Sequence, residues 1–305
     1  MPPSETDLYV DEQRRLTGLA YRLTGSWADA EDAVQDAFSR WYALAPGERA
    51  EIRSPEAWLT TVTSRLCLDL LRSARVRRER YVGRWLPEPL PHAVTASLDV
   101  DRTDDPADRA VQDESLSTAF LVMLESMTPA ERVAFVLHDV FAYTFAEIAI
   151  TLERSPAAAR QLASSARRRI GAAARPASSG TDHAAAVHRL RLAWEAGDIG
   201  ALVGILDPGV TLVADGGGVV AAALRPVHGA DAVARYFATV SAQAAGLTLH
   251  ERSVNGRPGL VAEHAGSPAT VAAFAFAGGR IVRIWAVRNP DKLSLWGAAP
   301  QPGTR

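Results

Sequence analysis

The sequence predicts a multidomain protein in which two all-α modules precede an α+β domain. Apolar residues recur at helical spacing before residue 80 and again from about 109 to 175. After residue 180, short apolar runs alternate with glycine-rich turns, which is typical of strands. A chain of 305 residues with 48% hydrophobic composition can bury more than one core. We expect domains at 1–80, 109–175 and 181–305, with a linker at 81–108.

The first module is predicted to contain three helices. Leucines at helical spacing predict the first, over residues 8–24. Ser26 is suited to cap a second helix with acidic first turns, where the helix dipole favours negative charge. Ser54 and Pro55 open a third helix, because serine caps a helix and proline fits its first position.

The second module carries three helix-capping signatures, at Thr128, Thr144 and Ser155. They predict helices of about 129–141, 145–152 and 156–173. The last two are separated by a turn of helix-turn-helix length, which favours DNA binding through the third helix. Its first turns carry small alanines, followed by an arginine and a glutamine that can make bidentate contacts to base edges. The alternative is an ordinary helical hairpin.

Charge is unevenly distributed although the formal net charge is only −2. Arginines cluster between Arg65 and Arg84 and again between Arg154 and Arg175, on either side of an acidic linker. This pattern indicates two contact points on one polyanion, as in a nucleic-acid-binding protein. Two solvated helix faces are the alternative.

The linker, 81–108, is rich in proline and acidic residues but contains RWLPEPLP. Trp85 and Leu86 are costly to leave in water, so we expect them to dock on a neighbouring element rather than to form an exposed pair.

The third domain is predicted to be a curved antiparallel sheet wrapped around a helix, with a cavity at its mouth. Helices are expected from Asp182 to about 196 and over 230–243. Asn255-Gly256 and Gly278-Gly279 are hairpin signals. Strand-like runs lie at 210–218, 219–227, 247–256, 259–266, 268–279 and 280–290.

The remaining features narrow the function classes. Cys67 is the only cysteine, and no secretory or membrane-spanning run is found, so we expect a cytoplasmic protein without membrane partners. No metal-ligand spacing, nucleophile motif or phosphate loop is found, so no metal, cofactor or catalytic residue is assigned. A catalytic cone is the rival interpretation, with five candidate groups that are more often structural. These are Asp215, Tyr236, His228, His250 and His264.

The segments together resemble bacterial RNA polymerase sigma factors of the extracytoplasmic-function (ECF) type. DAEDAVQDAFSRWY and SPEAWLTTVTSRLCLDLLRSARVRR resemble sigma region 2, and MTPAERVAFVLHDVFAYTFAEIAITLERSPAAARQLASSARRRI resembles region 4. The third domain resembles the SnoaL-type cone. WLPEP, DGGG and NPDKL are similar to segments of the SigJ-like group. The resemblance implies a non-enzymatic sigma factor that binds promoter DNA and, through the beta-prime clamp and beta flap, the RNA polymerase core.

The resemblance also implies residue roles. Polymerase contacts fall on Asp29, Asp32, Gln35, Asp36 and Trp41, with core packing an equal alternative for Trp41. Contacts to the minus-ten promoter element fall on Arg65, Asp69, Arg72, Arg75, Arg77 and Arg78. Contacts to the minus-thirty-five element fall on Arg154, Ser155, Ala157, Arg160, Gln161 and Arg167.

In the resembling group, the cone contacts the linker and sets sigma activity, and whether it activates or inhibits is left open. The residues implied are Trp85, Leu86, Pro87, Glu88, Pro89, Asp215, Gly216, Gly217, Gly218, Asn289, Pro290, Asp291, Lys292 and Leu293. Lys292, the only lysine among 33 basic residues, is expected to pair with Glu88 or Asp215 unless it is a random survivor. Val219 departs from the lysine common in the group after DGGG.

Two alternatives stay open. An unidentified small ligand in the cavity is a further candidate partner, and a ligand-binding or isomerase-like cone coupled to a DNA-binding regulator is the second function considered. A plain helix-turn-helix regulator is disfavoured, because it leaves the arginine-rich segment at 55–80 unexplained.

Overall fold

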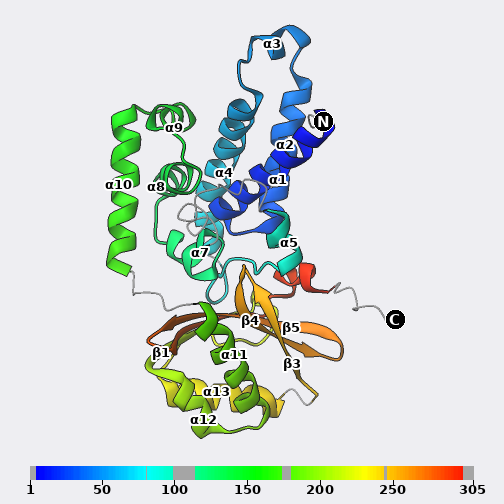
Figure 1. Cartoon of the computed structure of the whole chain (residues 1–305), viewed down its shortest axis with the longest axis vertical. Helices are drawn as coiled ribbons and strands as arrows, with labels where there is room; N and C mark the ends of the chain where they lie inside the picture. Colours follow the sequence, from blue (N-terminus) through cyan, green and yellow to red (C-terminus); the bar gives the residue numbers. More distant parts are fainter. Residues whose placement is uncertain (1–4, 80, 99–113, 174–179, 244–245, 298–305) are drawn as a thin grey trace. The chain divides into compact units, whose positions relative to one another are not determined.

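The computed structural model describes residues 5–79, 81–98, 114–173, 180–243 and 246–297. The chain divides into two compact units, and each is described by itself (Figure 1). No helix in the described ranges is long and apolar enough to cross a membrane. Unit 1 comprises 1–79, 96–116 and 120–174, and unit 2 comprises 80–95, 117–119 and 175–305.

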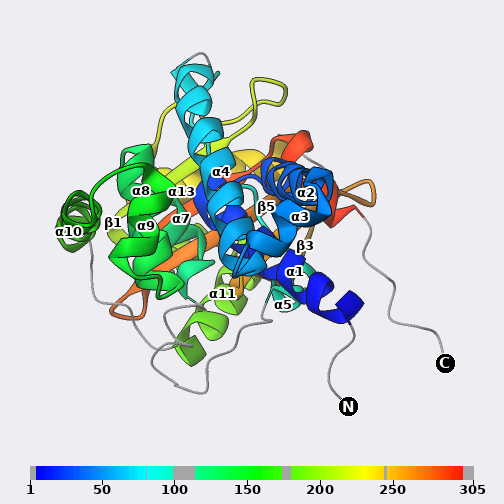
Figure 2. The ribbon, with the colours of Figure 1, turned by 90° about the horizontal axis from the view of Figure 1, so that it is seen from above.

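Unit 1 begins with helices that start where the capping residues predict. The side chain of Ser26 accepts the Asp29 amide at 3.3 Å, and that of Ser54 accepts the Ala57 amide at 3.2 Å. The helix at residues 46–51 is short, begins with proline and was not predicted from apolar periodicity. In Figure 2 the two helices α1 and α2 and the long helix α4 form one group. The bounds are α1 (Glu5–Thr24), α2 (Trp27–Ala43), α3 (Pro46–Glu51) and α4 (Pro55–Glu79).

The second half of unit 1 contains the predicted helix-turn-helix. Both predicted capping boxes form, at Thr128 and Thr144. The helix expected over 129–141 is not uniform, because the amide of Phe141 bonds the carbonyl of Val136, five residues back, and the helix widens into a π-turn. The elements are α7 (Thr118–Leu124), α8 (Pro129–Phe135), η2 (Val136–Val140), α9 (Phe145–Leu152) and α10 (Pro156–Ala173).

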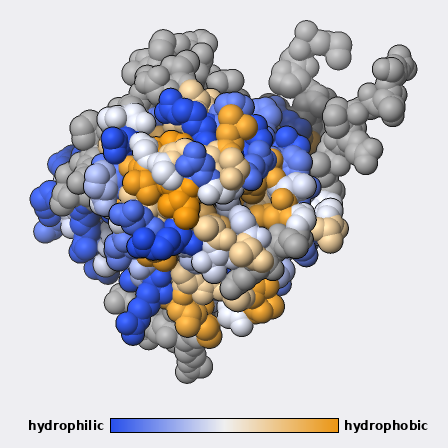
Figure 3. Space-filling model, turned by 90° about the horizontal axis from the view of Figure 1, so that it is seen from below, coloured by the Kyte–Doolittle hydropathy of each residue, from blue (hydrophilic) through white to orange (hydrophobic). Residues whose placement is uncertain are grey.

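Unit 2 contains a sheet with the strand order β2-β1-β6-β5-β4-β3. Its helices lie against one face (Figure 1) and form an apolar core with the strands, including Leu190, Leu212 and Ile284. On the face shown in Figure 3, hydrophobic residues (orange) lie among hydrophilic ones (blue). The elements are α11 (Gly180–Glu195), α12 (Ile199–Ile205), β1 (Leu206–Asp215), β2 (Val227–His228), α13 (Ala230–Gln243), β3 (Thr248–Val254), β4 (Arg257–His264), β5 (Ser267–Ala277) and β6 (Arg280–Val287).

The sheet differs from the sequence prediction in two ways. It is mixed, because β1 pairs with β6 in parallel, with Leu212 opposite Ile284. The run at 219–227 forms a strand only at its end, since the amides of Val219 and Val220 bond the carbonyl of Gly216 and turn the chain. The hairpins at Asn255-Gly256 and Gly278-Gly279 are confirmed, with positive φ at all four residues.

The first part of the linker belongs to unit 2. It runs from Tyr81 to Pro91 before the short helix α5 (His92–Ser97). Leu86 and Leu90 are buried and Trp85 is half-buried, so the expected docking is confirmed. After β6, the last described segment of the chain forms two 3₁₀ turns, η3 (Pro290–Lys292) and η4 (Ser294–Trp296).

Candidate functional sites

A buried carboxylate joins the linker to the cone within unit 2. Asp215 ends β1 and is fully buried. Its oxygens accept the phenol of Tyr81 at 2.6 Å and the amides of Leu86 at 2.9 Å and Gly217 at 3.0 Å. Nζ of Lys292 lies 2.8 Å from Oδ2. A buried charge is tolerated only when it is paired and hydrogen-bonded in this way.

Lys292 binds the linker as well as the acid. Its Nζ donates to the carbonyl of Leu86 at 2.6 Å and lies 4.2 Å from the centre of the Trp85 ring. An ammonium is a compact charge whose donors can point in several directions, whereas a guanidinium is a wider planar fork. This geometry gives a physical reason for a lysine in a chain that otherwise uses arginine. Of the two acids expected as partners, Asp215 forms the ion pair.

Tyr81 adds a neutral donor to the same cluster. Burial and the hydrogen bond to Asp215 raise the pKa of its phenol above the ordinary value. The hydroxyl therefore keeps its proton at neutral pH and donates it to Asp215. The side-chain amide of Asn289 donates to the same hydroxyl at 3.1 Å. Tyr81 lies before the WLPEP motif, so no sequence pattern marked it.

The positions after Asp215 require glycine because neighbouring atoms lie where a Cβ would stand. Gly217 has φ +66°, and a Cβ there would lie 2.5 Å from the side chain of Asn289. A Cβ on Gly216 would collide with the carbonyl of Val220. Val219, where the resembling group carries lysine, is exposed. The DGGG segment therefore acts through its backbone here, not through an added charge.

Two further contacts from the cone hold the linker. Nε1 of Trp296 donates to the carbonyl of Pro89 at 2.9 Å. The side chain of Asn255 accepts the Leu90 amide at 3.1 Å, while its own backbone amide bonds the Leu90 carbonyl. Sequence reasoning used Asn255 only as a turn residue and did not anticipate this second role. Pro87, Glu88 and Pro89 are buried in the same segment.

The residues expected to read the minus-thirty-five element lie at the start of α10. Ser155 caps the helix by accepting the Ala158 amide at 3.2 Å, while Arg160 and Gln161 are exposed. The Arg160 guanidinium lies 5.2 Å from the centre of the Phe145 ring. Of the small residues in this turn, Ala157 is exposed, whereas Ala159 is fully buried in the core. Arg154 is exposed, and Nε of Arg167 lies 2.8 Å from Asp139.

The basic flank of α4 is partly engaged inside unit 1. Arg65 donates to the carbonyls of Ile150 at 2.7 Å and Thr151 at 3.3 Å, and lies 3.4 Å from Glu153. Arg72 pairs with Asp69 at 3.0 Å on an exposed surface. Arg75, Arg77 and Arg78 fall within α4, but their side chains lie outside the described part of the structure.

The two helical modules pack together through a polar cluster. Arg15 of α1 donates to Glu12, to Thr60 of α4 at 2.7 Å and to Tyr143 at 3.0 Å. Burial alone would lower the pKa of Arg15, but its hydrogen bonds to Glu12 and Tyr143 raise it. Nη1 of Arg132 also bonds the carbonyl of Leu23 at 2.9 Å. These contacts hold the helix-turn-helix against the first module.

The acidic face of α2 is available to a partner. Asp32, Gln35 and Asp36 are exposed, and Asp29 is half-buried. Trp41 differs, because it is 4% exposed and packs on Trp58 of α4 at 5.4 Å between ring centres. Its side chain is thus a core group, and the polymerase contact expected of it has no accessible ring to use.

The five side chains considered for catalysis do not lie together in one site. Asp215 is engaged by Lys292, His228 lies 3.2 Å from Thr211, and His250 lies 3.4 Å from Glu263. Only Tyr236 lines the cavity of the cone. Within the described ranges no three metal-ligating side chains meet. The buried Cys67 has a raised thiol pKa because of burial, as expected for a structural cysteine.

A two-part helical unit with a capped helix-turn-helix, followed by a cone that holds the linker, defines a promoter-recognition subunit with an added C-terminal domain. The family models Sigma-70 region 2 and Sigma-70, region 4 match residues 8–77 and 117–170. The chain belongs to the ECF RNA polymerase sigma factors.

Two curated relatives match along almost their whole length. The chain is 42% identical over 295 residues to the ECF RNA polymerase sigma factor SigJ of Mycobacterium tuberculosis, covering 92% of this chain and 91% of that protein. It is 37% identical over 286 residues to the probable ECF RNA polymerase sigma factor SigI of the same organism, covering 91% of each. The crystal structure of M. tuberculosis SigJ matches with a TM-score of 0.75 at 37% identity, covering 97% of this chain and all of that one.

The family assigns the function. The protein is a non-enzymatic sigma factor that acts with the RNA polymerase core and promoter DNA in promoter-specific initiation of transcription. The expected fold class, helical regions 2 and 4 followed by an α+β SnoaL-like domain, is confirmed.

Proposed function

We propose that the cone regulates this sigma factor in cis by holding residues 81–90 of the linker. The observation that carries the proposal is the buried carboxylate of Asp215, which accepts donors from Tyr81 and Leu86 of the linker and from Lys292 of the cone. The linker connects region 2 to region 4, so a grip on it limits how far the two regions can separate.

The promoter contacts are proposed for two exposed helical surfaces. Arg160 and Gln161 of α10 would read bases of the minus-thirty-five element, while Arg154 would contact its backbone. Arginines of α4 would bind phosphates of the minus-ten element, with Asp69 orienting Arg72. The exposed acids of α2 would contact the beta-prime clamp, and region 4 would contact the beta flap.

Arg65 suggests that promoter binding requires a change within unit 1. Its guanidinium is occupied by the carbonyls of Ile150 and Thr151. A bidentate contact from Nε and Nη2 of Arg65 to a DNA phosphate requires these bonds to break. The closed arrangement would thus be a resting form, and region 4 would move away from α4 on promoter binding.

Whether the cone activates or inhibits transcription depends on two effects of its contacts with the linker. Holding the linker restrains opening, so residues 181–305 would inhibit in part. The same contacts order the linker, so the segment from Asn289 to Leu293 would be needed for full activity. The two effects have opposite signs, so removal of residues 181–305 and a substitution in the Asn289–Leu293 segment test them separately.

Run-off transcription with purified core polymerase on genomic fragments is the direct test. The full chain should give defined transcripts, residues 1–180 should give at least threefold more, and Lys292→Met should give at least threefold less. Arg283→Gln, an exposed substitution on β6, should leave the yield unchanged. If residues 1–180 and Lys292→Met both matched the full chain, regulation through the linker would be wrong while the sigma activity stood. If no protein gave a transcript with competent core, the sigma function itself would fail.

A further inference from the structure

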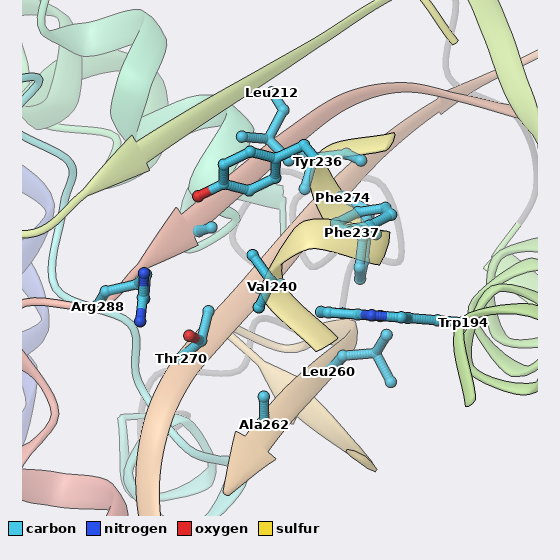
Figure 4. Close-up of a pocket in the computed structure, with 13 residues that line it drawn as sticks. Trp194, Leu212, Tyr236, Phe237, Val240, Leu260, Ala262, Thr270, Phe274 and Arg288 are labelled. Atoms are coloured by element: carbon cyan, nitrogen blue, oxygen red, sulfur yellow. The ribbon is translucent and has the colours of Figure 1, made fainter. Parts of the chain in front are cut away.

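The cone contains an apolar cavity with one charged end (Figure 4). Its empty volume is about 480 Å³, counting the part open to solvent. Trp194, Phe237, Leu260 and Phe274 form its apolar side, and the Nε1 of Trp194 is satisfied by Ser241 at 2.7 Å. An apolar lining with a few polar groups at one side is typical of small-molecule sites.

The polar groups gather at the other side. Figure 4 shows Arg288 and Thr270 together there, with the hydroxyl of Tyr236 directed toward them. Arg288 follows β6 on the face of Ile284 and Ala286, which also line the cavity, because side chains alternate along a strand. The strand register therefore places a cation at the rim of an apolar space.

The guanidinium of Arg288 is only partly satisfied. One terminal nitrogen donates to the carbonyl of Ala221. The Nε is buried and has no hydrogen-bond partner, and within the described residues no carboxylate lies within ion-pair distance of the group. Buried polar atoms are almost always paired, so an unpaired charged donor beside a cavity is a position at which an anionic ligand would be stabilised.

We propose that this cavity binds a small organic anion with a compact apolar body, whose carboxylate or similar acidic group is bound by Arg288. The apolar body would occupy the space between Trp194, Phe237 and Leu260, and its acidic oxygens would accept from Nε of Arg288. Thr270 and Tyr236 offer further hydroxyl donors. A neutral analogue of the same shape fills the apolar side equally well but leaves the guanidinium without its acceptor.

Occupancy of this site would reach the linker by a short route. The backbone amide of Arg288 donates to the Asp215 carbonyl at 2.7 Å, and the next residue, Asn289, contacts Tyr81. A ligand that moves Arg288 thus acts on the group that holds the linker. This coupling rests on the proposed regulatory function, whereas binding itself does not.

Equilibrium dialysis of the full chain against 2-naphthoate and its neutral amide, 2-naphthamide, tests the proposal. We expect saturable one-to-one binding of the acid, at least tenfold tighter than the amide at pH 7. Arg288→Gln should weaken the acid at least tenfold and leave the amide unchanged. Arg283→Gln, on the same strand but the opposite face, should change neither. Ala262→Phe, which fills the apolar side, should abolish binding of both, with circular dichroism verifying that each variant is folded.

The outcomes are separable. No saturable binding of the acid, equal affinity for acid and amide, or an unchanged affinity in folded Arg288→Gln would each overturn the site. If the acid binds as expected but amide hydrogen exchange at Leu86 and Leu90 is unaffected by saturating 2-naphthoate, the coupling is wrong and the site stands. Transcription assays are not needed for either result.

Discussion

Nζ of Lys292 lies 2.8 Å from Oδ2 of Asp215, and the carboxylate is fully buried. The two residues are 77 positions apart in the sequence. The same ammonium also bonds the Leu86 carbonyl of the linker. A single pair of charges therefore connects the end of β1 and the C-terminal turn η3 of the cone to the linker that precedes the domain.

Removing the ammonium should destabilise unit 2. Lys292→Met leaves the Asp215 carboxylate buried without its cation, which typically costs about 3–5 kcal/mol. The double variant Lys292→Met, Asp215→Asn should recover part of the loss, since no unpaired charge remains. Urea unfolding followed by tryptophan fluorescence measures both. A loss below about 1 kcal/mol, as for a surface ion pair, would contradict the assigned role.

A methyl group at Gly217 should loosen the linker. Gly217→Ala places a Cβ against Asn289 at a positive φ, so the turn or the asparagine must shift. We expect faster amide exchange at Leu86 than in the parent protein. Gly204→Ala is the matched control, since nothing lies within 4 Å of a Cβ there and its φ is not positive. Equal exchange in both variants would show that the close approach is not needed.

Glu131 should make unit 1 sensitive to acid. Burial alone would raise its pKa, but hydrogen bonds from Ser165 and Thr128 and the nearby Arg169 lower it below the ordinary value. A lowered pKa contributes stability above the unfolded-state pKa, near 4.5, and this contribution is lost as pH falls through the folded-state value. Unfolding free energy should therefore drop on acidification in the parent protein.

The variants identify the group responsible. Glu131→Gln should be less stable at pH 7 and should flatten the acid dependence, because the glutamine does not titrate. Ser165→Ala should flatten it in part, since it removes one hydrogen bond that favours the carboxylate. Urea unfolding at a series of pH values between neutrality and the acid range measures the slopes. Parallel curves for parent and Glu131→Gln would assign the acid sensitivity to other groups.

Substitutions around the start of α10 should distinguish contacts to bases from contacts to phosphates. Arg160→Ala should cost about 1–3 kcal/mol on the preferred promoter and relax specificity at one position, whereas Arg154→Ala should weaken all promoters alike. Fluorescence anisotropy of the holoenzyme on promoters with single base changes measures both. Arg160 also contacts Phe145, so the thermal midpoint is the control for folding. Uniform weakening by Arg160→Ala would make it a backbone contact.

The local signals in the sequence were reliable where they depend on neighbouring residues. The caps at Ser26, Thr128 and Thr144 define helix starts because a hydroxyl reaches an amide three residues on. The turn at Asn255-Gly256 formed for the same kind of reason, as both residues tolerate positive φ. The short helix α3 and the loop at 219–226 were missed, because the first has little periodicity and the second has the composition of a strand.

The sequence by itself determined the long helices, the hairpins, the order of the domains and the single lysine that marked the C-terminal segment. Only the tertiary structure decided which acid Lys292 meets, that Trp41 is a core residue, and that Arg65 is held by the carbonyls of α9. It also showed that Tyr81 belongs to the Asp215 cluster and that Arg288 reaches the cavity. Hydrogen bonds within a turn are fixed by spacing along the chain, whereas these contacts join residues whose proximity is set by the packing of separate elements.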